Sequence, residues 1–599
     1  MPQHTFSRQR LRSVAAGALA TIPVVAPHLA AQADSARTRR GGAIATANID
    51  SGLVVPGRSV VATRLGIVAS SHPLASAAGV RMLDMGGNAI DAAIAANATI
   101  GLMEPMMNGM GGDLFAIVYE AKTGKLYGLN SGGWAPTGLT ADLLASKGNQ
   151  RMPQRGVYTV TVPGAVAGWD ALRTKFGTMR FDQLLAPAIY YAENGFPVSE
   201  VDAGMWAGAE RNAAANAAFK GTYLVNGSSP RAGEVFRNPD LASSLRRVAA
   251  KGRAGFYAGP TADAILSTLR ELGGTMTPQD LAEFVPEWVT PLSTTYHGWT
   301  VYELPPNSQG MAALEMLNIM ERFPLASWGF HSAKALHVMI EAKKFAYSDL
   351  LRYVGDPRYT KIPVEQMLGA ANTDARAKAI NPARATCRVE PARFAELERG
   401  GSETIYLTAV DKDGNIVSLI QSNYSEFGSG LVASGTGFVL HNRGGLFTMD
   451  KGQPNTIAPR KRPLHTIIPA YMEKDGTRIG FGIMGGWNQS QAHAQFVANI
   501  ADYGMTIQQA LEAGRFTKTN FDGCDVNIES RVSDKTRVEL TTLGHELQLR
   551  GPRTGIFGYG QAVMSNPAGV HFGASDPRHD GAAIPQGAPI SGTPRPTKP

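Results

Sequence analysis

Residues 400–430 have the sequence GGSETIYLTAVDKDGNIVSLIQSNYSEFGSG, in which two apolar runs flank a short polar stretch. The runs 404–410 and 416–422 are rich in β-branched and aromatic residues, which favours two strands. The stretch DKDGN between them predicts a tight turn and therefore a β-hairpin. If pairing is symmetric about the middle of the turn, Thr404 lies opposite Ser422, with both hydroxyls on one face of the sheet.

Thr404 follows a Gly-Gly-Ser-Glu stretch. A loop of this composition can turn the backbone sharply, which would expose the Glu403 carbonyl to the Thr404 hydroxyl. Hydroxyls on strands also commonly bond a neighbour or pack without further function. The spacing by itself therefore leaves both a catalytic and a structural role open.

Elsewhere the chain alternates between blocks of helix and blocks of strand, and no internal repeat is visible. Helices are predicted at 74–85, 89–103, 181–194, 240–251, 261–273, 333–350 and 489–503, and strands at 114–120, 125–130 and 301–304. From residue 404 to the helix near 489 strands are expected to dominate, and the tail at about 573–599 is expected to lie along the surface or to be loose and flexible. Blocks without regular βαβ alternation favour an α+β layered architecture over a doubly wound sheet.

The composition indicates a large globular protein: of 599 residues, 44% are hydrophobic and 18% are charged. The formal charge of 57 − 49 = +8 is concentrated at the N-terminus. The first 40 residues hold six arginines against one acid, Asp34, so the remainder carries only +3. No basic cluster interleaved with aromatic residues follows, and nucleic-acid binding is not expected.

The N-terminus has the pattern of a secretory signal. Arg8, Arg10 and Arg12 precede the apolar stretch 14–26, and Ala-Gln-Ala at 31–33 matches a signal-peptidase site. The apolar stretch is too short to cross a bilayer, and no later run reaches eighteen apolar residues, so no membrane span is expected. We predict a signal peptide over 1–33 and a periplasmic or secreted protein.

Two cysteines, Cys387 and Cys524, are too few for a disulfide scaffold or a four-cysteine zinc site. Export would permit a bridge between them, but the sequence equally allows two unpaired buried thiols.

The hairpin and several further motifs resemble the γ-glutamyltransferase family. The motifs are ASSHPLAS at 69–76, GGNAIDAAIAA at 86–96, EPMMNGMGGDLF at 104–115, TVPGAVAGW at 161–169, LAPAIYYAENGFPVS at 185–199, FGSG at 427–430, KRPLHTIIPA at 461–470 and the glycine pair at 485–486. They cover nearly all of the chain after the signal segment, in order, which makes the resemblance specific although each motif alone is weak.

The resemblance implies a four-layer αββα sandwich of the N-terminal-nucleophile hydrolase type. It also implies an inactive precursor that cuts itself between Glu403 and Thr404, giving a large chain, 34–403, and a small chain, 404–599. Cleavage would free the Thr404 amine, and an α-amino pKa of roughly 7.7–8.0 leaves a neutral fraction near pH 7 that can act as general base.

The family pattern assigns supporting roles as well. Ser422 matches a helper threonine that holds the nucleophile's hydroxyl, and Gly485 and Gly486 match the glycines whose amides stabilise the oxyanion. Water or an amine would resolve the acyl-enzyme. No metal or other cofactor is expected, because there is no HExxH motif and the 12 histidines are scattered.

The groups that grip an α-amino acid in the family are replaced in this chain. Gly132 stands at the position of the carboxylate-binding arginine, His465 and Thr466 stand in place of a serine pair, and Leu446 stands where an acid binds the α-ammonium. Arg443, beside Asn442, and His465 when charged are alternative carboxylate ligands. Trp134, if it lines the pocket, would suit a flatter or more apolar acyl group.

The sequence therefore predicts an exported, self-processing amidohydrolase that cleaves γ-glutamyl amides such as glutathione by hydrolysis or transpeptidation. The alternatives are an enzyme of the same family acting on a glutaryl, cephalosporin-type or oxamate-type amide, a non-catalytic exported binding protein, and a protein that cleaves itself without turning over amides. The expected partners are a small-molecule substrate, water or an amine acceptor, and the two chains of one precursor.

Overall fold

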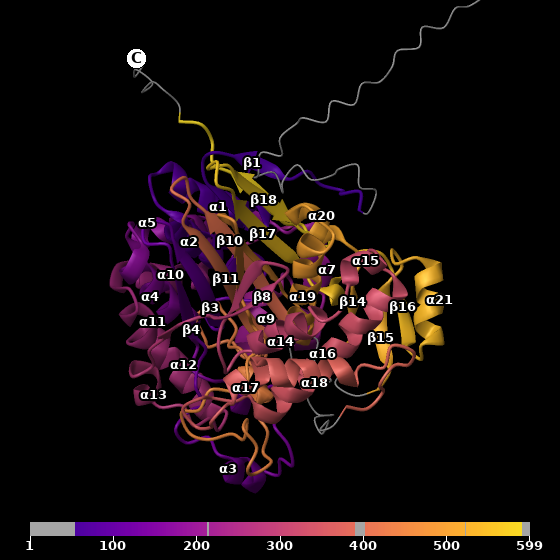
Figure 1. The fold of residues 1–599 in the computed structure, drawn as a ribbon. Coiled ribbons are helices and arrows are strands. Elements are labelled where there is room, and N and C mark those ends of the chain that lie inside the picture. The colour runs from indigo at the N-terminus through magenta and orange to yellow at the C-terminus, as the bar shows by residue number, and fades with distance from the viewer. Residues whose placement is uncertain (1–53, 213–214, 390–401, 521–522, 590–599) are drawn as a thin grey trace, which may run out of the picture. The chain divides into compact units, whose positions relative to one another are not determined.

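Two seven-stranded antiparallel sheets form the centre of this computed structural model, which describes residues 54–212, 215–389, 402–520 and 523–589 (Figure 1). The first sheet has the order β1 (Val61–Thr63), β18 (His571–Ser575), β17 (Gly560–Ser565), β13 (Thr477–Ile483), β12 (Ala470–Lys474), β9 (Trp299–Glu303) and β8 (Leu292–Tyr296). The second has the order β19 (Ala582–Pro585), β2 (Ile67–Ser70), β10 (Ser402–Val410), β11 (Ile416–Ser425), β3 (Asp113–Glu120), β4 (Lys125–Ser131) and β7 (Glu287–Val289).

The second sheet is buried on both faces, as its sequence requires. In β3, Leu114, Ala116 and Val118 pack with helices, while Phe115 and Ile117 belong to a separate core between the two sheets. Because successive side chains of a strand point to opposite faces, an unbroken apolar run such as LFAIVY fits a strand with an apolar layer on each side.

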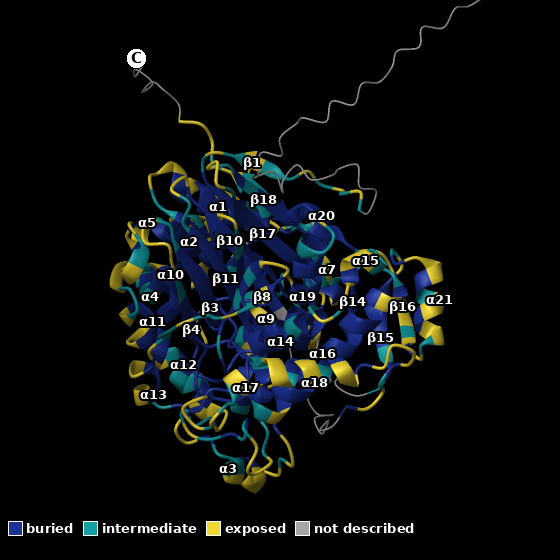
Figure 2. Ribbon diagram, in the orientation of Figure 1, coloured by how far each residue is buried: buried dark blue, intermediate teal, exposed yellow. Residues whose placement is uncertain are grey.

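Helices cover the outer face of each sheet. Against the second sheet lie α1 (Pro73–Asp84), α2 (Ala89–Met103), α4 (Ala165–Phe176) and α10 (Pro239–Lys251); against the first lie α14 (Gly310–Met320), α16 (Ala333–Tyr353) and α19 (Gln489–Ala501). The layers are thus helix, sheet, sheet and helix, and the predicted α+β class with a four-layer αββα sandwich is confirmed. The strands β10 and β11 and helix α2 are buried in the middle of these layers (Figure 2).

Smaller elements complete the described chain. They are α3 (Ala141–Ser146), η3 (Val157–Thr159), α5 (Phe181–Leu184), α6 (Ala186–Asn194), β5 (Phe196–Pro197), α7 (Glu200–Trp206), α8 (Ala209–Asn212), α9 (Ala217–Tyr223), β6 (Val235–Phe236), α11 (Ala254–Tyr257), α12 (Pro260–Glu271), α13 (Pro278–Ala282), α15 (Leu325–Trp328), α17 (Val364–Leu368), α18 (Ala370–Ala379), η5 (Arg443–Leu446), η6 (Gly486–Asn488), α20 (Ile507–Glu512), β14 (Phe516–Thr517), β15 (Asp525–Glu529), α21 (Asp534–Thr542), β16 (Glu546–Arg550) and η7 (Gly555–Phe557).

Local sequence signals place the first two helices where they were predicted. Gly86, with φ of 89°, ends α1 in a conformation that glycine adopts without strain. Asn88 then caps α2: its Oδ1 accepts from the amides of Ile90 and Asp91, and the Asp91 carboxylate accepts from the Asn88 amide. Such a capping box satisfies amides that have no partner within the helix.

Two predictions about the last third of the chain need correction. From 404 to 489 the main regular elements are the predicted strands, β10, β11, β12 and β13, but between β11 and β12 the described chain has only η5 and isolated bridges. Gly428, Gly430 and Gly437 have positive φ there, which breaks an extended run. The predicted loose tail is also wrong for 573–589, where β18 and β19 pair within the two sheets, while 590–599 lie outside the described residues.

The hairpin has the predicted register over most of its length. Ile405 to Val410 of β10 pair with Gln421 to Ile416 of β11, symmetrically about the turn. The register then shifts between Glu403 and Ile405, so that Glu403 pairs with Tyr424. Between these two pairs Thr404 of β10 stands opposite two residues of β11, Ser422 and Asn423, so the extra residue of this β-bulge lies in β11.

A disulfide joins Cys387 and Cys524, so the structure decides between the two alternatives that the sequence left open. The two cysteines lie on opposite sides of the predicted cleavage point, 137 residues apart. If the chain is cut before Thr404, the bridge therefore links the two products covalently.

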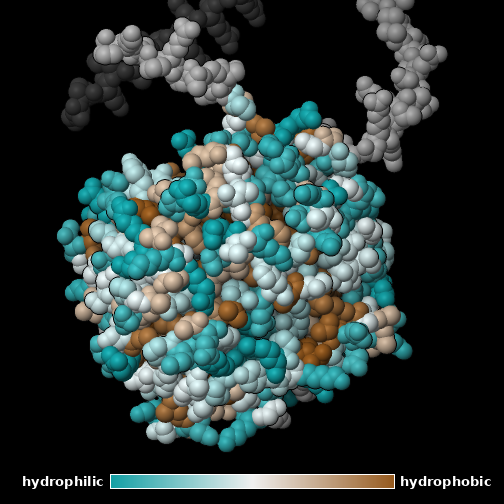
Figure 3. Space-filling model, turned by 90° about the vertical axis from the view of Figure 1, so that its left-hand side faces the viewer, coloured by the Kyte–Doolittle hydropathy of each residue, from teal (hydrophilic) through white to brown (hydrophobic). Residues whose placement is uncertain are grey.

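The face of the molecule in Figure 3 is mostly polar, with separate apolar patches. No helix among the described residues is long and apolar enough to cross a membrane. The predicted signal peptide, 1–33, lies outside the described residues.

Candidate active site

Thr404 of β10 stands opposite the bulge in β11, and its side chain is fully buried. Its hydroxyl donates to Ser422 Oγ over 3.1 Å, and Ser422 Oγ also accepts from the Tyr424 amide over 2.7 Å. Two donors thus converge on one hydroxyl oxygen, which fixes Ser422 and, through it, the rotamer of Thr404. The structure brings together the two hydroxyls that the hairpin predicted, although through a bulge and not through a regular pair.

The backbone beside this pair is strained. Tyr424 has φ of 75°, which is rare for a residue with a large side chain. Asn423 anchors this part of β11, because its side-chain amide donates to the carbonyls of Pro105 and Asn108. Strain of this kind costs about 1–3 kcal/mol and persists where surrounding contacts enforce it, typically at functional sites.

Asp113 lies directly opposite Ser422 in the neighbouring strand β3. Side chains of directly opposed residues share a face of the sheet, so Thr404, Ser422 and Asp113 form one row. Asp113 Oδ2 accepts from Arg443 Nε over 2.9 Å and lies 3.0 Å from a ring nitrogen of both His441 and His465. A buried carboxylate with three such partners is the centre of a network.

The groups around Asp113 differ in their charge. Burial opposes ionisation of Asp113, but its contacts with His441 and His465 hold the pKa of the carboxyl well below its usual value. Burial, followed by the nearby Arg443 charge, lowers the pKa of His465 to about 3. His465 is therefore neutral at physiological pH, and Asp113 and Arg443 form the charged pair.

Arg443 is the fully buried cation of the site. Its Nη1 donates to Thr466 Oγ1 over 2.7 Å, and its guanidinium lies 4.8 Å from the centre of the Tyr424 ring. Its Nη2 has no hydrogen-bond partner within the described part of the chain. An unsatisfied donor on a buried cation is costly, and a carboxylate is the group that would satisfy it best.

The predicted glycine pair lies between β13 and α19, and the turn η6 that begins at Gly486 packs against β10. Gly485 has φ of 126° and Gly486 has φ of 55°, so both positions favour glycine. Gln309 Nε2 donates to the Gly486 carbonyl over 2.7 Å and holds the turn. The first amides of a helix have no partner within it, which leaves them available to an oxyanion.

The family model described as Gamma-glutamyltranspeptidase matches residues 75–586. This chain belongs to the gamma-glutamyltranspeptidase family. It is 37% identical to the glutathione hydrolase-like YwrD proenzyme of Bacillus subtilis over 88% of this chain and 99% of that protein. It is 34% identical to the oxamate amidohydrolase proenzyme of Klebsiella pneumoniae over 86% and 98%. The crystal structure of cephalosporin acylase from Bacillus halodurans superposes with a TM-score of 0.82 at 40% identity, covering 88% and 97%.

These relatives support a self-processing amidohydrolase of the gamma-glutamyltranspeptidase family, as the sequence predicted. They do not test the roles of individual residues, which remain predictions. Among the residues predicted to bind substrate, the structure gathers Arg443, His465 and Thr466 around Asp113. It also places Trp134 close by, because the amide of the preceding Gly133 donates to Asp113 Oδ1.

Two predicted substrate ligands are engaged with the protein itself. The Asn442 side chain bonds Ser425 and the Gln154 carbonyl, which makes it a brace between loops in this structure. His465 accepts from the Ile467 amide at Nδ1 and so donates from Nε2 to Asp113, an arrangement that orients the carboxylate. Its predicted role as a charged ligand therefore has no support from this geometry.

The remaining positions define an apolar side of the site. Trp134 packs edge-on against Phe284, and its indole Nε1 has no partner among the described residues. Leu446 is fully buried, so no charge stands at the position where the family's acid was expected. A Cβ atom at Gly132 would lie 3.2 Å from the His465 ring, so the imidazole fills the space of a side chain there.

Sequence reasoning missed Asp113, His441 and Tyr424. The only signal for Asp113 was its place at the end of the glycine-rich loop, in the motif GMGGD, which directly precedes a strand. Among the described residues, the groups with metal-ligand geometry are His337 with Glu341 and His545, and Glu104 with Asp202 and His579, and neither group includes Thr404 or the Asp113 network.

The buried neutral state of His465 predicts a pH-dependent stability. The pKa of His465 is about 3 in the folded protein and near 6.5 in the unfolded chain. Between these values the unfolded chain binds a proton at this residue and the folded chain does not. The contribution of His465 to the free energy of unfolding is present above pH 6.5. It is lost as the pH falls towards 3, by at most about 1.4 kcal/mol per pH unit. Urea unfolding of wild type and His465→Gln at pH 7.5, 6 and 5 measures this. The difference should shrink with falling pH, and a constant difference would contradict the assignment.

Proposed function

We propose that the chain cuts itself before Thr404 and then hydrolyses or transfers short acyl groups that carry a carboxylate, γ-glutamyl groups among them, through an acyl-Thr404 intermediate. The observation that carries the acyl preference is the unsatisfied Nη2 of buried Arg443, in the network that continues the row of Thr404 and Ser422. The three relatives support amide cleavage, since their names describe a glutathione hydrolase-like protein, an amidohydrolase and an acylase.

Self-cleavage begins with attack of the Thr404 hydroxyl on the Glu403 carbonyl. The peptide C–N bond breaks as the Thr404 nitrogen takes up a proton, and hydrolysis of the resulting ester leaves a free Thr404 amine. The bulge in β11 opposite Thr404 interrupts the regular ladder beside the proposed cleavage point. Ser422 holds the hydroxyl in a single rotamer during this step.

In the cleaved protein the Thr404 amine accepts the proton of its own hydroxyl as the oxygen attacks the substrate carbonyl. The amides of Gly485 and Gly486 donate to the oxyanion, a contribution worth roughly 10²–10³ in rate for each donor. The amine returns its proton to the leaving group. Water or an amine then attacks the ester, which gives hydrolysis or transpeptidation.

Recognition of the acyl group follows from the charged and apolar side chains around Arg443. Arg443 Nη2 is the donor for a carboxylate, and Thr466 holds the guanidinium in place. Leu446 offers nothing to an α-ammonium, so a glutaryl group, which has the carboxylate but no ammonium, should be accepted at least as well as a γ-glutamyl group. This favours the glutaryl or cephalosporin-type alternative over strict specificity for glutathione.

A matched set of anilides tests the proposal: γ-glutamyl, glutaryl and butyryl, which differ only in ammonium and carboxylate. We expect kcat/KM for the glutaryl amide to equal or exceed that for the γ-glutamyl amide, and to exceed that for butyryl by about 10²-fold, because a lost charged partner costs roughly 2–5 kcal/mol. Equal rates for glutaryl and butyryl would contradict the carboxylate site. No turnover of any amide by fully cleaved protein would contradict the enzymatic function.

We also propose that the protein is exported, as the predicted signal peptide suggests. The disulfide between Cys387 and Cys524 supports an oxidising compartment, because the cytosol keeps such thiols reduced. Fractionation of cells that produce the full chain, with N-terminal sequencing of the large chain, tests this. A chain that retains residues 1–33 in the cytosol would contradict it.

A further inference from the structure

Glu104, Asp202 and His579 bring three ligand atoms within 4.8 Å of one another, and all three side chains are buried. They come from distant parts of the chain: the end of α2, helix α7, and the segment between β18 and β19. Burying two carboxylates beside an imidazole is costly unless a proton or a bound cation balances their charge. No residue of the Thr404 site belongs to this cluster.

Two polar atoms of the cluster, Asp202 Oδ1 and His579 Nε2, have no hydrogen-bond partner in the described part of the chain. Asp202 Oδ1 lies 3.6 Å from His579 Nε2, too far for a hydrogen bond, and neither atom bonds anything else. Asp202 is fully buried and His579 is 2% exposed. Leaving two such atoms unsatisfied costs about 1–3 kcal/mol each, which is unusual in a well-packed interior.

The hydrogen bond of His579 Nδ1 indicates which nitrogen of the neutral ring is available as a ligand. Its Nδ1 lies 2.9 Å from the Ser71 carbonyl, which can only accept, so Nδ1 carries a proton, and in the neutral ring Nε2 presents a lone pair to the Asp202 carboxylate. Two acceptors face each other across 3.6 Å. An imidazole that donates from one nitrogen to a carbonyl while the other is free is the usual arrangement of a metal-ligating histidine.

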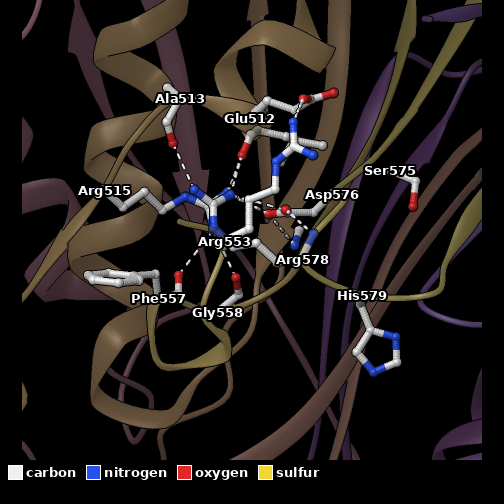
Figure 4. Close-up of polar contacts among 12 residues, drawn as sticks. Glu512, Ala513, Arg515, Arg553, Phe557, Gly558, Ser575, Asp576, Arg578 and His579 are labelled. Carbon is white, nitrogen blue, oxygen red and sulfur yellow. Dashed lines mark hydrogen bonds and ion pairs between the residues drawn. The ribbon is translucent and has the colours of Figure 1, made fainter. Parts of the chain in front are cut away.

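Neighbouring groups fix the cluster in place. Ser71 Oγ donates to Glu104 over 2.7 Å and Ser199 Oγ donates to Asp202 Oδ2 over 2.5 Å, so each carboxylate is oriented by a hydroxyl. The preceding residue, Arg578, is locked into buried ion pairs with Asp576 and Glu529, and the His579 ring lies apart from that network (Figure 4).

We propose that Glu104, Asp202 and His579 form a binding site for a divalent cation of the zinc class. Zinc binds histidine nitrogen and carboxylate oxygen at about 2.0–2.2 Å with tetrahedral geometry, which places two ligand atoms about 3.5 Å apart. The observed 3.6 Å between Asp202 Oδ1 and His579 Nε2 matches this separation. Two carboxylates neutralise the ion, and an imidazole ligand disfavours calcium and magnesium.

His72 is not assigned as a ligand, although its Nε2 lies 3.8 Å from Asp202 Oδ2 and has no bond to a described residue. Its Nδ1 accepts from the Leu74 amide, so Nε2 carries the proton of the neutral ring. His72 is therefore a neighbour of the site, and water takes the fourth position of the ion.

The position of the cluster indicates a structural role for the cation. Glu104 begins the loop that ends at Asp113, and the next carbonyl, that of Pro105, accepts from Asn423 beside Ser422. Glu104 and Asp202 precede residue 403, whereas His579 follows it. The cation thus holds the loop beneath the catalytic hairpin and joins the two chains of the cleaved protein.

The second cluster of potential ligands, His337 with Glu341 and His545, provides a matched control. His337 Nδ1 and His545 Nε2 are hydrogen-bonded to each other over 2.8 Å, and Glu341 pairs with Lys344 over 2.7 Å while accepting from the Thr386 amide. These contacts occupy the ligand atoms and add a positive charge, so this cluster should not take up a cation.

The experiment measures the metal content of the full-length protein, purified without chelator from zinc-supplemented medium, by inductively coupled plasma mass spectrometry. We expect about one zinc ion per chain in wild type and in His337→Gln, and less than about a tenth of that in Asp202→Asn and His579→Gln. After removal of metal with chelator, adding Zn²⁺ or Co²⁺ should raise the Tm of wild type by at least about 2 °C.

Gel filtration and self-cleavage show whether each variant folds, and the wild-type measurements stand on their own if one does not. Wild-type protein without stoichiometric divalent metal, and without a shift in Tm on addition of Zn²⁺ or Co²⁺, would overturn the proposal. Metal retained by a folded Asp202→Asn variant, or lost by His337→Gln instead, would overturn the assignment of the ligands.

Discussion

Replacing Thr404 with alanine should leave a single uncut chain with no amidase activity. The substitution removes the oxygen that attacks Glu403 in the precursor and the substrate in the cleaved enzyme. Loss of a catalytic nucleophile typically lowers kcat by about 10⁵–10⁶-fold. The measurement is denaturing electrophoresis together with an anilide assay. The gel must contain reductant, because the bridge between Cys387 and Cys524 would otherwise hold both products in one band.

Two matched variants make this result specific. Thr408→Ala removes a buried threonine of the same strand whose hydroxyl bonds the Val417 carbonyl, and it should cut itself and retain activity. Thr404→Ser keeps a hydroxyl and should cleave, more slowly than wild type. Self-cleavage by Thr404→Ala, or equal loss in Thr408→Ala, would mean that Thr404 is not the nucleophile.

Replacing Arg443 with glutamine should have the second largest effect. It leaves the Asp113 carboxylate buried without its cation, which should destabilise the protein by about 3–5 kcal/mol. It also removes the Nη2 donor, so kcat/KM for glutaryl anilide should fall by about 10²-fold or more, whereas that for butyryl anilide should change little. Urea unfolding and the matched anilides measure the two effects separately.

The stability and recognition effects of Arg443 can be separated by a double mutant. Asp113→Asn with Arg443→Gln removes both charges, so it should recover much of the stability lost in Arg443→Gln without recovering the glutaryl preference. Arg443→Lys keeps the charge but not the planar fork. Its stability and its preference for glutaryl anilide should therefore lie between those of wild type and Arg443→Gln. A glutaryl preference that survives in Arg443→Gln would place the carboxylate elsewhere.

Local sequence patterns were sufficient to predict the strands and helices that build the site. The apolar runs and the DKDGN turn predicted the register from Ile405 to Val410 because a tight turn fixes pairing on both sides. The helices α1 and α2 were predicted to within one residue of their observed bounds for a similar reason: the glycines at 86–87 that end α1 are a short-range signal. Gly485 and Gly486 both have positive φ, which favours glycine at the two positions that the sequence singled out.

The electrostatic network could not be predicted because its members meet only in the folded chain. Asp113 is more than 300 residues from Arg443 and His465, and no periodicity connects them. The bulge opposite Thr404 and the positive φ of Tyr424 also depend on tertiary contacts, since local preference opposes both. The stretch between β11 and β12 has no strand in the described chain, and glycines with positive φ interrupt an extended conformation there.

The measurement that tests the central claim most directly is mass spectrometry of the protein quenched in acid during turnover of glutaryl anilide. We predict a small chain that begins at Thr404 and carries one glutaryl group on that residue, with neither feature in Thr404→Ala. A small chain that begins at another residue, or a glutaryl group bound elsewhere, would contradict Thr404 as both the point of cleavage and the nucleophile.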